Sequence, residues 1–268
     1  MRKDSVFKKI IWDHYREHGR ELAWRTTITP YRILVSEVML QQTQVARVQK
    51  VFPVFIRTFP SFAALAGASR TDVLRAWQGM GYNRRALALH GAAQMVVHEY
   101  HGRLPKTSEA LTRLPGVGPA TAASIVAFAF NVPTVFIETN IRRVYLHYFF
   151  SGAKEPVHDR EIFAHVARTV DADNPRQWYY ALMDYGSTLP RSVVNPNRRS
   201  AHYARQSTFE GSDRQLRGRI IRRLLNDGAR PEELALEFKE DIRRVKHVIA
   251  GMEKEGFVSA RRARWYIA

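Results

Sequence analysis

Two glycines separated by a single residue, Gly116 and Gly118, break the helical periodicity near the middle of the sequence. They belong to the run Leu114-Pro115-Gly116-Val117-Gly118, which follows one helical segment and precedes a second that starts near Pro119. Glycine permits a tight turn there and leaves backbone N–H groups uncovered at the start of the second helix. Such groups, together with the helix dipole, bind phosphate without reading a base sequence. The run predicts two helices joined by a phosphate-binding turn, with an ordinary helix–turn–helix corner as the alternative.

Helical periodicity extends over most of the remaining chain. Apolar residues recur at helical spacing in residues 31–51, 71–77 and 84–100, and in residues 121–130 of the helix that starts near Pro119. Pro30 stands just ahead of the first stretch, as is typical of a helix start. Because strand and helix patterns do not alternate, a doubly wound sheet is disfavoured and an all-α fold is expected.

The charge balance favours a polyanionic partner. The chain carries 42 Lys and Arg against 25 Asp and Glu, a net charge of +17. Nucleic acid is the default partner of such a chain, and a generically basic protein or a membrane-surface binder is the alternative. No apolar run approaches the roughly 18 residues that a membrane span needs, and residues 1–4 open no signal peptide, so we expect a cytoplasmic protein.

The sequence contains no cysteine. Disulfides, thiolate zinc sites and cysteine-ligated iron–sulfur clusters are therefore excluded, and no cofactor is expected.

Beyond residue 185 the helical pattern fades into a basic stretch and then resumes. Residues 185–208 hold no acidic residue but four arginines, Arg191, Arg198, Arg199 and Arg205, which form either a DNA-contacting loop or a solvated linker. Helical patterns then cover residues 213–225, 231–238 and 242–255, and two short strands follow at 257–258 and 265–267. This order is typical of a winged helix-turn-helix, although other small three-helix units share it.

The third of these helices carries the charge that we expect to contact a duplex. Asp241 caps the helix, and Arg243, Arg244, Lys246 and His247 follow it. A packing domain with a solvated charged face is the alternative interpretation.

Glu37 interrupts an apolar face. On a helix starting near Tyr31 it shares a side with Ile33, Leu34 and Leu40. A carboxyl group there is costly unless it is paired or functional, and burial raises its pKa until it can donate a proton near neutral pH. A glutamate at the edge of the stripe, reaching solvent, is the alternative.

Glu138 lies near the start of another helical segment, in the run of residues 137–144. The helix dipole would hold its carboxylate ionised, facing a developing positive charge. The alternative is a simple N-terminal acid with Asn140 as the cap.

Four segments together resemble one enzyme family. YRILVSEVMLQQTQV at 31–45, WQGMGY at 77–82, LPGVG at 114–118 and the ETNIRRV run from Glu138 are similar to the adenine DNA glycosylase (MutY-like) branch of the helix-hairpin-helix superfamily. The match runs over roughly residues 20–190 in order and spacing, and its most specific block is EVMLQQTQV. Endonuclease III-like and thymine-mismatch enzymes share the hairpin but fit this block less well.

The resemblance implies a role for each matching residue. Glu37 takes the position of the general acid that protonates adenine N7, Glu138 that of the catalytic aspartate, and Asn140 that of its neighbouring polar contact. Gln42 and Tyr82 match residues inserted into the duplex where the base has left. Expelling a purine requires a proton on the base and a negative charge near the sugar, and two carboxyl groups can supply these.

The resemblance also implies the DNA contacts and the outcome of the reaction. The lysine with which sister enzymes cut the strand corresponds to Ala120, so no Schiff base can form there and a monofunctional glycosylase is implied. The expected DNA contacts are Gln42, Tyr82, Leu114, Gly116, Val117, Gly118, Ala120, Arg142, Arg191, Arg198, Arg199, Arg243 and Arg244.

Three departures from the family limit this carry-over. The four-cysteine cluster loop that usually follows a segment like Asp184-Tyr185-Gly186 is absent, so the arginines of the basic stretch are candidates to replace its phosphate contacts. Glu138 stands where an aspartate is usual, and its extra methylene moves the carboxylate by roughly 1.5 Å, a misplacement that can lower a rate about 100-fold. Thr139 also replaces a glycine, which indicates that the whole turn has adapted. The residues after Phe209 are too few for the domain that reads 8-oxoguanine in the family, which leaves recognition of the opposite base open.

We therefore expect an all-α, two-lobed helix-hairpin-helix glycosylase fold with a small C-terminal winged-helix-like module. Residues 1–28 with 136–209 would form the terminal lobe, 29–135 a six-helix lobe with the hairpin, and 210–268 the module. The expected enzyme is a monomer at the nucleoid that acts on double-stranded DNA, with adenine opposite guanine or 8-oxoguanine as the first target. Thymine or uracil opposite guanine, an alkylated purine, and a non-catalytic damage sensor are the alternatives.

Overall fold

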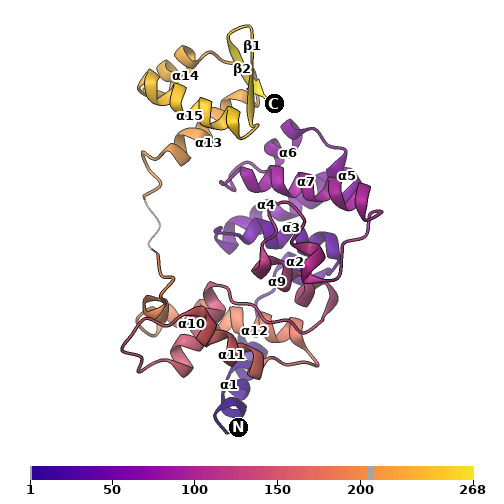
Figure 1. Cartoon of the computed structure of the whole chain (residues 1–268), viewed down its shortest axis with the longest axis vertical. Helices are drawn as coiled ribbons and strands as arrows, with labels where there is room; N and C mark the ends of the chain where they lie inside the picture. Colours follow the sequence, from indigo (N-terminus) through magenta and orange to yellow (C-terminus); the bar gives the residue numbers. More distant parts are fainter. Residues whose placement is uncertain (1, 205–207) are drawn as a thin grey trace. The chain divides into compact units, whose positions relative to one another are not determined.

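The computed structural model describes residues 2–204 and 208–268, apart from the side chain of Arg191. The fold is helical, with one short β-hairpin near the C-terminus (Figure 1). The chain forms two compact units, residues Met1–Glu37 with Leu104–Arg205 and residues Val38–Arg103 with Gln206–Ala268. The all-α fold predicted from the sequence is confirmed, whereas the division into three domains stays a prediction. Arg205 lies outside the described residues.

The first unit is organised around α12, which packs against α1, α9 and α10 (Figure 1). Its centre is aromatic, with the Phe7 ring 6.0 Å from that of Trp178 and 5.3 Å from that of Tyr145. Its elements are α1 (Arg2–His18), α2 (Ala23–Thr26), the start of α3 (Pro30–Leu40), α8 (Ser108–Leu111), α9 (Pro119–Phe130), α10 (Thr139–Phe149), α11 (Asp159–Thr169), α12 (Pro175–Thr188), η1 (Leu189–Arg191) and η2 (Pro196–Arg199).

The second unit combines a helical part with the C-terminal module. In the helical part α7 packs against α5 and α6. The elements are the end of α3, then α4 (Val45–Thr58), α5 (Phe62–Ala66), α6 (Arg70–Ala76), α7 (Arg84–Glu99), α13 (Asp213–Leu224), α14 (Pro231–Phe238), α15 (Ile242–Lys254), β1 (Val258–Arg261) and β2 (Arg264–Ile267).

Residues 31–51, which share one helical periodicity, form two helices. The first ends at Leu40 and the second starts at Val45. Between them Gln42 adopts a left-handed backbone with φ of 51°. Arg85 donates hydrogen bonds to the carbonyl groups of Val38 and Met39, both at 2.9 Å, and so satisfies the end of the first helix. The break therefore depends on a residue more than 40 positions away, which periodicity does not reveal.

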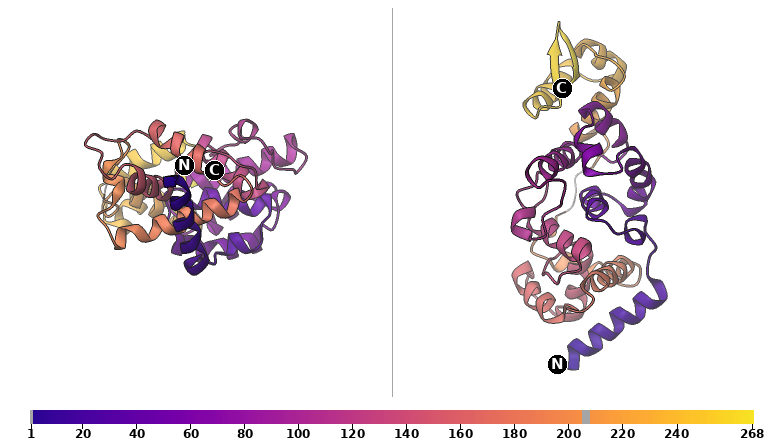
Figure 2. Two further views of the ribbon diagram at one scale, coloured as in Figure 1. Left: turned by 90° about the horizontal axis from the view of Figure 1, so that it is seen from below. Right: turned by 90° about the vertical axis from the view of Figure 1, so that its right-hand side faces the viewer.

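The C-terminal module has the connectivity of a winged helix. Three helices precede an antiparallel hairpin in which Val258 faces Ile267 and Arg261 faces Arg264; Figure 2 shows the two strands side by side. Ala229, between the first two helices, adds a third strand position by exchanging backbone hydrogen bonds with Trp265, at 3.1 and 2.8 Å. The predicted winged-helix-like module is thus confirmed.

Among the residues that the structure describes, no helix is both long enough and apolar enough to cross a membrane.

Candidate active site

Glu37 lies in α3 with its carboxyl group against α9. Ser124, which is buried, places its hydroxyl 2.5 Å from Glu37 Oε2. Glu37 itself keeps partial access to solvent. Burial and, to a smaller extent, the charge of Glu138 nevertheless raise the pKa of Glu37, while Ser124 and Arg25 lower it, and the net result is a rise from 4.5 to about 7. A carboxyl group of this kind can hold a proton near neutral pH and still reach a substrate.

Ser124 is a hydroxyl donor to Glu37. Its Oγ also lies 2.9 Å from the carbonyl oxygen of Thr121, which can only accept, so these two acceptors share the single hydroxyl proton. Donation to Glu37 favours the ionised carboxylate and lowers its pKa, whereas burial raises the pKa more strongly. The protonated form of Glu37 is therefore favoured by burial and not by its hydrogen bond to Ser124.

Glu138 is surrounded by donors instead. It is the N-cap residue of α10, and its Oε1 accepts hydrogen bonds from the backbone N–H groups of Asn140 at 2.7 Å and Ile141 at 2.8 Å. The Asn140 amide donates to Oε2 at 3.2 Å. Burial raises the pKa of Glu138, and these N–H groups and the charges of Arg143 and Arg142 oppose that shift. The cap is thus Glu138 and not Asn140, and the helix N-terminus is only one of several influences on its ionisation.

The turn that carries Glu138 is held in place by contacts with α12. Arg143 donates hydrogen bonds to Asn140 Oδ1 at 3.0 Å and to the carbonyl group of Gly186 at 2.6 Å. A Cβ atom on Gly186 would stand 2.4 Å from the carbonyl oxygen of Asn140. Only glycine permits this close approach, so Gly186 and Arg143 hold the Glu138–Asn140 turn in place.

A buried ion pair completes the surroundings of Glu37. Asp184, only 1% exposed, accepts hydrogen bonds from Arg25 Nη1 at 2.8 Å and from Arg20 Nε at 2.7 Å. The Arg25 guanidinium also lies over the Tyr180 ring, 4.2 Å from its centroid. Asp184 therefore compensates a buried cation whose field would otherwise ionise Glu37 more strongly. Sequence reasoning missed Arg25 and Ser124, because neither stands near Glu37 in the chain.

In the second unit, the two residues expected to enter the duplex share an uncommon backbone conformation. Gln42 and Tyr82 have φ values of 51° and 45°, in the left-handed region that side chains disfavour. Arg85 joins their two loops by donating hydrogen bonds to Thr43 Oγ1 at 2.9 Å and to the carbonyl group of Gly81 at 3.3 Å, besides its bonds to the end of α3. Burial lowers the pKa of Arg85 to about 10. Arg85 is thus a positioning residue, and no local sequence pattern points to it.

The hairpin run lies where predicted, before the first turn of α9. Gly118 is the N-cap residue with φ of −84°, and a Cβ atom there would meet nothing within 4 Å. Neither backbone strain nor packing inside the protein therefore requires a glycine. A close external partner would require one. Leu114 and Val117 are buried and hold the turn, while Gly116, Gly118 and Ala120 are exposed.

The arginines expected to contact DNA differ in their availability. Arg142 donates hydrogen bonds to both carboxylate oxygens of Asp159, at 2.7 and 2.6 Å. Arg244 donates to Asp213 at 3.0 Å and to Glu240 at 2.7 Å. These two guanidinium groups are engaged inside the protein. Arg198 and Arg243 are exposed, and Arg199 is partly buried.

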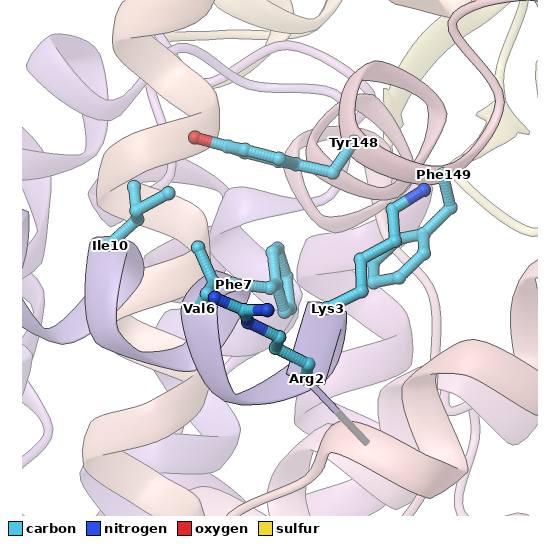
Figure 3. A pocket seen from close by; sticks show the side chains of 7 residues that line it. All are labelled: Arg2, Lys3, Val6, Phe7, Ile10, Tyr148 and Phe149. Carbon is cyan, nitrogen blue, oxygen red and sulfur yellow. The ribbon is translucent and has the colours of Figure 1, made fainter.

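A surface pocket in the first unit is separate from these groups. It is apolar, with Phe7 at its floor (Figure 3), and it contains neither Glu37 nor Glu138. Its lining comes from α1 (Arg2, Lys3, Val6, Phe7, Ile10) and α10 (Tyr148, Phe149). Over residues 2–204 and 208–268, no group of three or more His, Asp or Glu side chains is arranged to hold a metal ion.

Comparison of the sequence with known proteins gives a consistent result. Residues 35–168 match the HhH-GPD superfamily of base excision DNA repair proteins. The chain is 34% identical over 244 residues to an adenine DNA glycosylase of Mycolicibacterium smegmatis, covering 85% of this chain and 82% of that protein. It is 35% identical over 231 residues to an adenine DNA glycosylase of Mycobacterium tuberculosis, covering 79% and 75%.

Comparison with solved structures identifies the same fold. A thermostable thymine-DNA glycosylase matches with a TM-score of 0.66 and 25% identity, covering 75% of this chain and 93% of that one. An endonuclease III trapped on DNA matches with a TM-score of 0.54 and 20% identity, covering 69% and 83%.

Proposed function

This chain belongs to the HhH-GPD superfamily of base excision DNA repair proteins, and we propose that it is a monofunctional glycosylase that removes adenine from mispairs with guanine or 8-oxoguanine. That it is a DNA glycosylase follows from the family, whereas the base and the absence of strand cleavage are proposals. The curated relatives cited above, which are adenine DNA glycosylases at 34–35% identity, support adenine as the target. A monomer acting at the nucleoid in the cytoplasm likewise stays our expectation.

The contrast between the two carboxyl groups carries the proposed mechanism. Burial raises the pKa of Glu37 to about 7 against a hydrogen bond from the Ser124 hydroxyl, whereas Glu138 accepts from three N–H donors. In the proposed reaction Glu37 protonates the departing base, and ionised Glu138 stabilises the positive charge that develops on the deoxyribose. Hydrolysis by water then leaves an abasic site.

The absence of strand cleavage is proposed from Ala120. This exposed residue follows Gly118 at the position where the resemblance places the lysine of strand-cutting relatives. A methyl group cannot form a Schiff base with the sugar. Borohydride should therefore trap no covalent protein–DNA adduct during turnover, and a trapped adduct would contradict this part of the proposal.

A product assay tests the target base. Duplexes with a single defined mispair are incubated with enzyme in excess, abasic sites are cleaved with alkali, and the strands are separated. We expect cleavage at adenine opposite guanine or 8-oxoguanine. Release of thymine, uracil or an alkylated purine instead, with adenine untouched in every pair, would assign the alternative substrate to the same site. If the duplexes bind but no base is released, the chain is a damage sensor.

The pKa of Glu37 predicts the basic side of the pH profile. Glu37 holds its proton below about pH 7 and loses it above, since burial raises its pKa from 4.5 to about 7. Only the protonated form can act as the acid, so the single-turnover rate should fall about tenfold per pH unit above pH 8. Rates measured from pH 6 to 9.5 test this, and a rate that stays level to pH 9.5 would contradict the role of Glu37.

Arg243 is expected to strengthen DNA binding without affecting the chemistry. It is exposed on α15, and no acidic partner is recorded for it among the described residues, whereas Arg244 beside it pairs with Asp213. Arg243→Ala should therefore weaken duplex binding severalfold and reduce the salt slope by about 1, with single-turnover base release unchanged at saturation. Fluorescence anisotropy between 50 and 300 mM salt measures both quantities. The control is Glu253→Gln, which removes an exposed negative charge from the same helix and should not weaken binding.

A further inference from the structure

The loop that ends in Tyr82 is held in an unfavourable conformation. Gly79 and Gly81 have φ values of 84° and 67°, which glycine adopts freely, but Tyr82 follows with φ of 45°. A non-glycine residue stays in this region only when its surroundings over-determine it, and such residues gather at functional sites. From within the helical part the indole of Trp77 donates to the carbonyl group of Gly81 at 3.1 Å, and the Arg85 guanidinium lies 5.5 Å from the centre of the Tyr82 ring.

The C-terminal module, which belongs to the same compact unit, adds a second guanidinium to this ring. Arg214, in the first turn of α13, donates a hydrogen bond from Nη1 to the Tyr82 hydroxyl at 2.8 Å. Its guanidinium carbon stands 5.9 Å from the centre of the ring. The hydrogen bond from Arg214 therefore fixes the phenol oxygen of Tyr82, and the guanidinium groups of Arg85 and Arg214 lie near its ring. Even so, 37% of Tyr82 stays exposed.

The contact between Arg214 and Tyr82 is supported by ion pairs beside it. Glu255, at the end of α15, accepts hydrogen bonds from Arg84 at 2.7 Å and from Arg217 at 2.9 Å. Arg84 follows Tyr82 by two positions, and Arg217 lies one helical turn after Arg214. The two guanidinium groups lower the pKa of Glu255 to about 2, so this link is ionised at any working pH. It keeps α13 in register with the Tyr82 loop.

We propose that Arg214 is a positioning residue that holds the Tyr82 ring ready to enter the duplex, so that the C-terminal module takes part in extruding the target base. This inference rests on the proposed function, because it requires Tyr82 to fill the space that the base leaves. A side chain that is already ordered loses less conformational freedom on insertion than a mobile one. The module thereby acts on base flipping itself, beyond adding affinity for DNA.

A double-mutant cycle tests the coupling. Arg214→Ala, Tyr82→Ala and the double variant are mixed rapidly with a mispaired duplex that carries 2-aminopurine beside the target base, and the fluorescence rise reports extrusion. Arg214→Ala should slow extrusion about 3- to 10-fold when Tyr82 is present. In the Tyr82→Ala background the same substitution should slow extrusion by less than about twofold, because the side chain that Arg214 positions is already absent. Arg214→Lys should not restore the rate, since lysine lacks the planar fork that contacts ring and hydroxyl together.

Arg222→Ala is the matched control. Arg222 is an exposed cation on the same helix, and no contact between it and Tyr82 is recorded in the described chain. It removes the same charge and should leave the extrusion rate unchanged. Equal slowing by Arg214→Ala in both Tyr82 backgrounds, or full activity of Arg214→Lys, would make Arg214 a simple phosphate contact and overturn the proposal.

The outcome for Tyr82 separates this inference from the proposed function. If Tyr82→Ala neither slows extrusion nor changes base release, Arg214 has no wedge to position and the inference fails, while base release by the unchanged protein still supports the glycosylase proposal. If the unchanged protein extrudes the base but releases none, the proposed function fails, and the coupling between Arg214 and Tyr82 is still measured by the fluorescence cycle.

Discussion

Replacing Glu37 by glutamine should lower the single-turnover rate of base release by a factor of about 100 to 10,000. Glutamine keeps the shape of the side chain and a hydrogen-bond partner for Ser124, but it has no proton that it can give to a departing base. The measurement is base release from a saturated mispaired duplex, with enzyme in excess so that product release does not contribute. Binding of the same duplex should change less than threefold, since the substitution alters the chemical step and leaves the DNA-contacting loops intact.

The control for this substitution is Glu17→Gln. Glu17 is an exposed glutamate on α1, and its replacement makes the same change of residue type at a side chain that does not contact Ser124. It should retain the unchanged rate. A Glu37→Gln variant that keeps more than a tenth of the activity would show that another group supplies the proton, and the assignment of Glu37 as the acid would have to be abandoned.

Loss of activity in Glu37→Gln should not come from loss of fold, because above pH 7 this variant should be the more stable protein. The folded-state pKa of about 7 exceeds the ordinary 4.5, so proton binding stabilises the native chain fully below pH 4.5 and this contribution is lost as the pH rises through 7. The difference corresponds to at most about 3 kcal/mol, an upper limit since Glu37 is partly accessible. Urea unfolding at pH 8.5 should show the gain, which should shrink below about 1 kcal/mol near pH 5.

The local signals in the sequence are sufficient for the helices of the C-terminal module. Its helices begin and end within one residue of the predicted bounds, because Pro231, Asp241 and Gly256 act on the backbone that directly adjoins them. The periodicity of residues 31–51 is not sufficient in the same way. There the separation of α3 from α4 depends on the hydrogen bonds of Arg85, a contact between distant parts of the sequence.

The residues of the candidate site likewise differ in whether the sequence identifies them. A charge on an apolar stripe makes Glu37 a candidate and the start of a helix makes Glu138 one, and the family resemblance assigns their roles. The groups that set their protonation, Ser124 and Arg25, are distant in sequence and needed the structure. Arg244 shows the converse, since its place on a basic helix predicted a DNA contact but Asp213, 31 positions earlier, engages it. Sequence patterns report which face a residue occupies, whereas pairing across helices is a tertiary property.

Glu138 combines two roles that one substitution can separate. As the N-cap of α10 it needs only an acceptor oxygen for the N–H groups of Asn140 and Ile141, and an amide oxygen serves as well as a carboxylate. As the proposed stabiliser of the sugar cation it needs its negative charge. Glu138→Gln keeps the first property and removes the second.

We expect Glu138→Gln to lose base release about 100- to 1000-fold, as is typical when one preorganised electrostatic contact to the transition state is removed. Its stability should change by no more than about 1 kcal/mol, because the cap is retained. Glu138→Asp should keep more activity than Glu138→Gln, since charge and cap both remain, although its shorter reach can itself lower the rate by up to about 100-fold. Glu161→Gln is the matched control: Glu161 accepts a hydrogen bond from the backbone N–H of His158 at 2.9 Å at the start of α11, and its loss should leave base release unchanged. Near-normal activity in Glu138→Gln would reduce Glu138 to a helix cap, and the charge opposite the sugar would then have to come from another group.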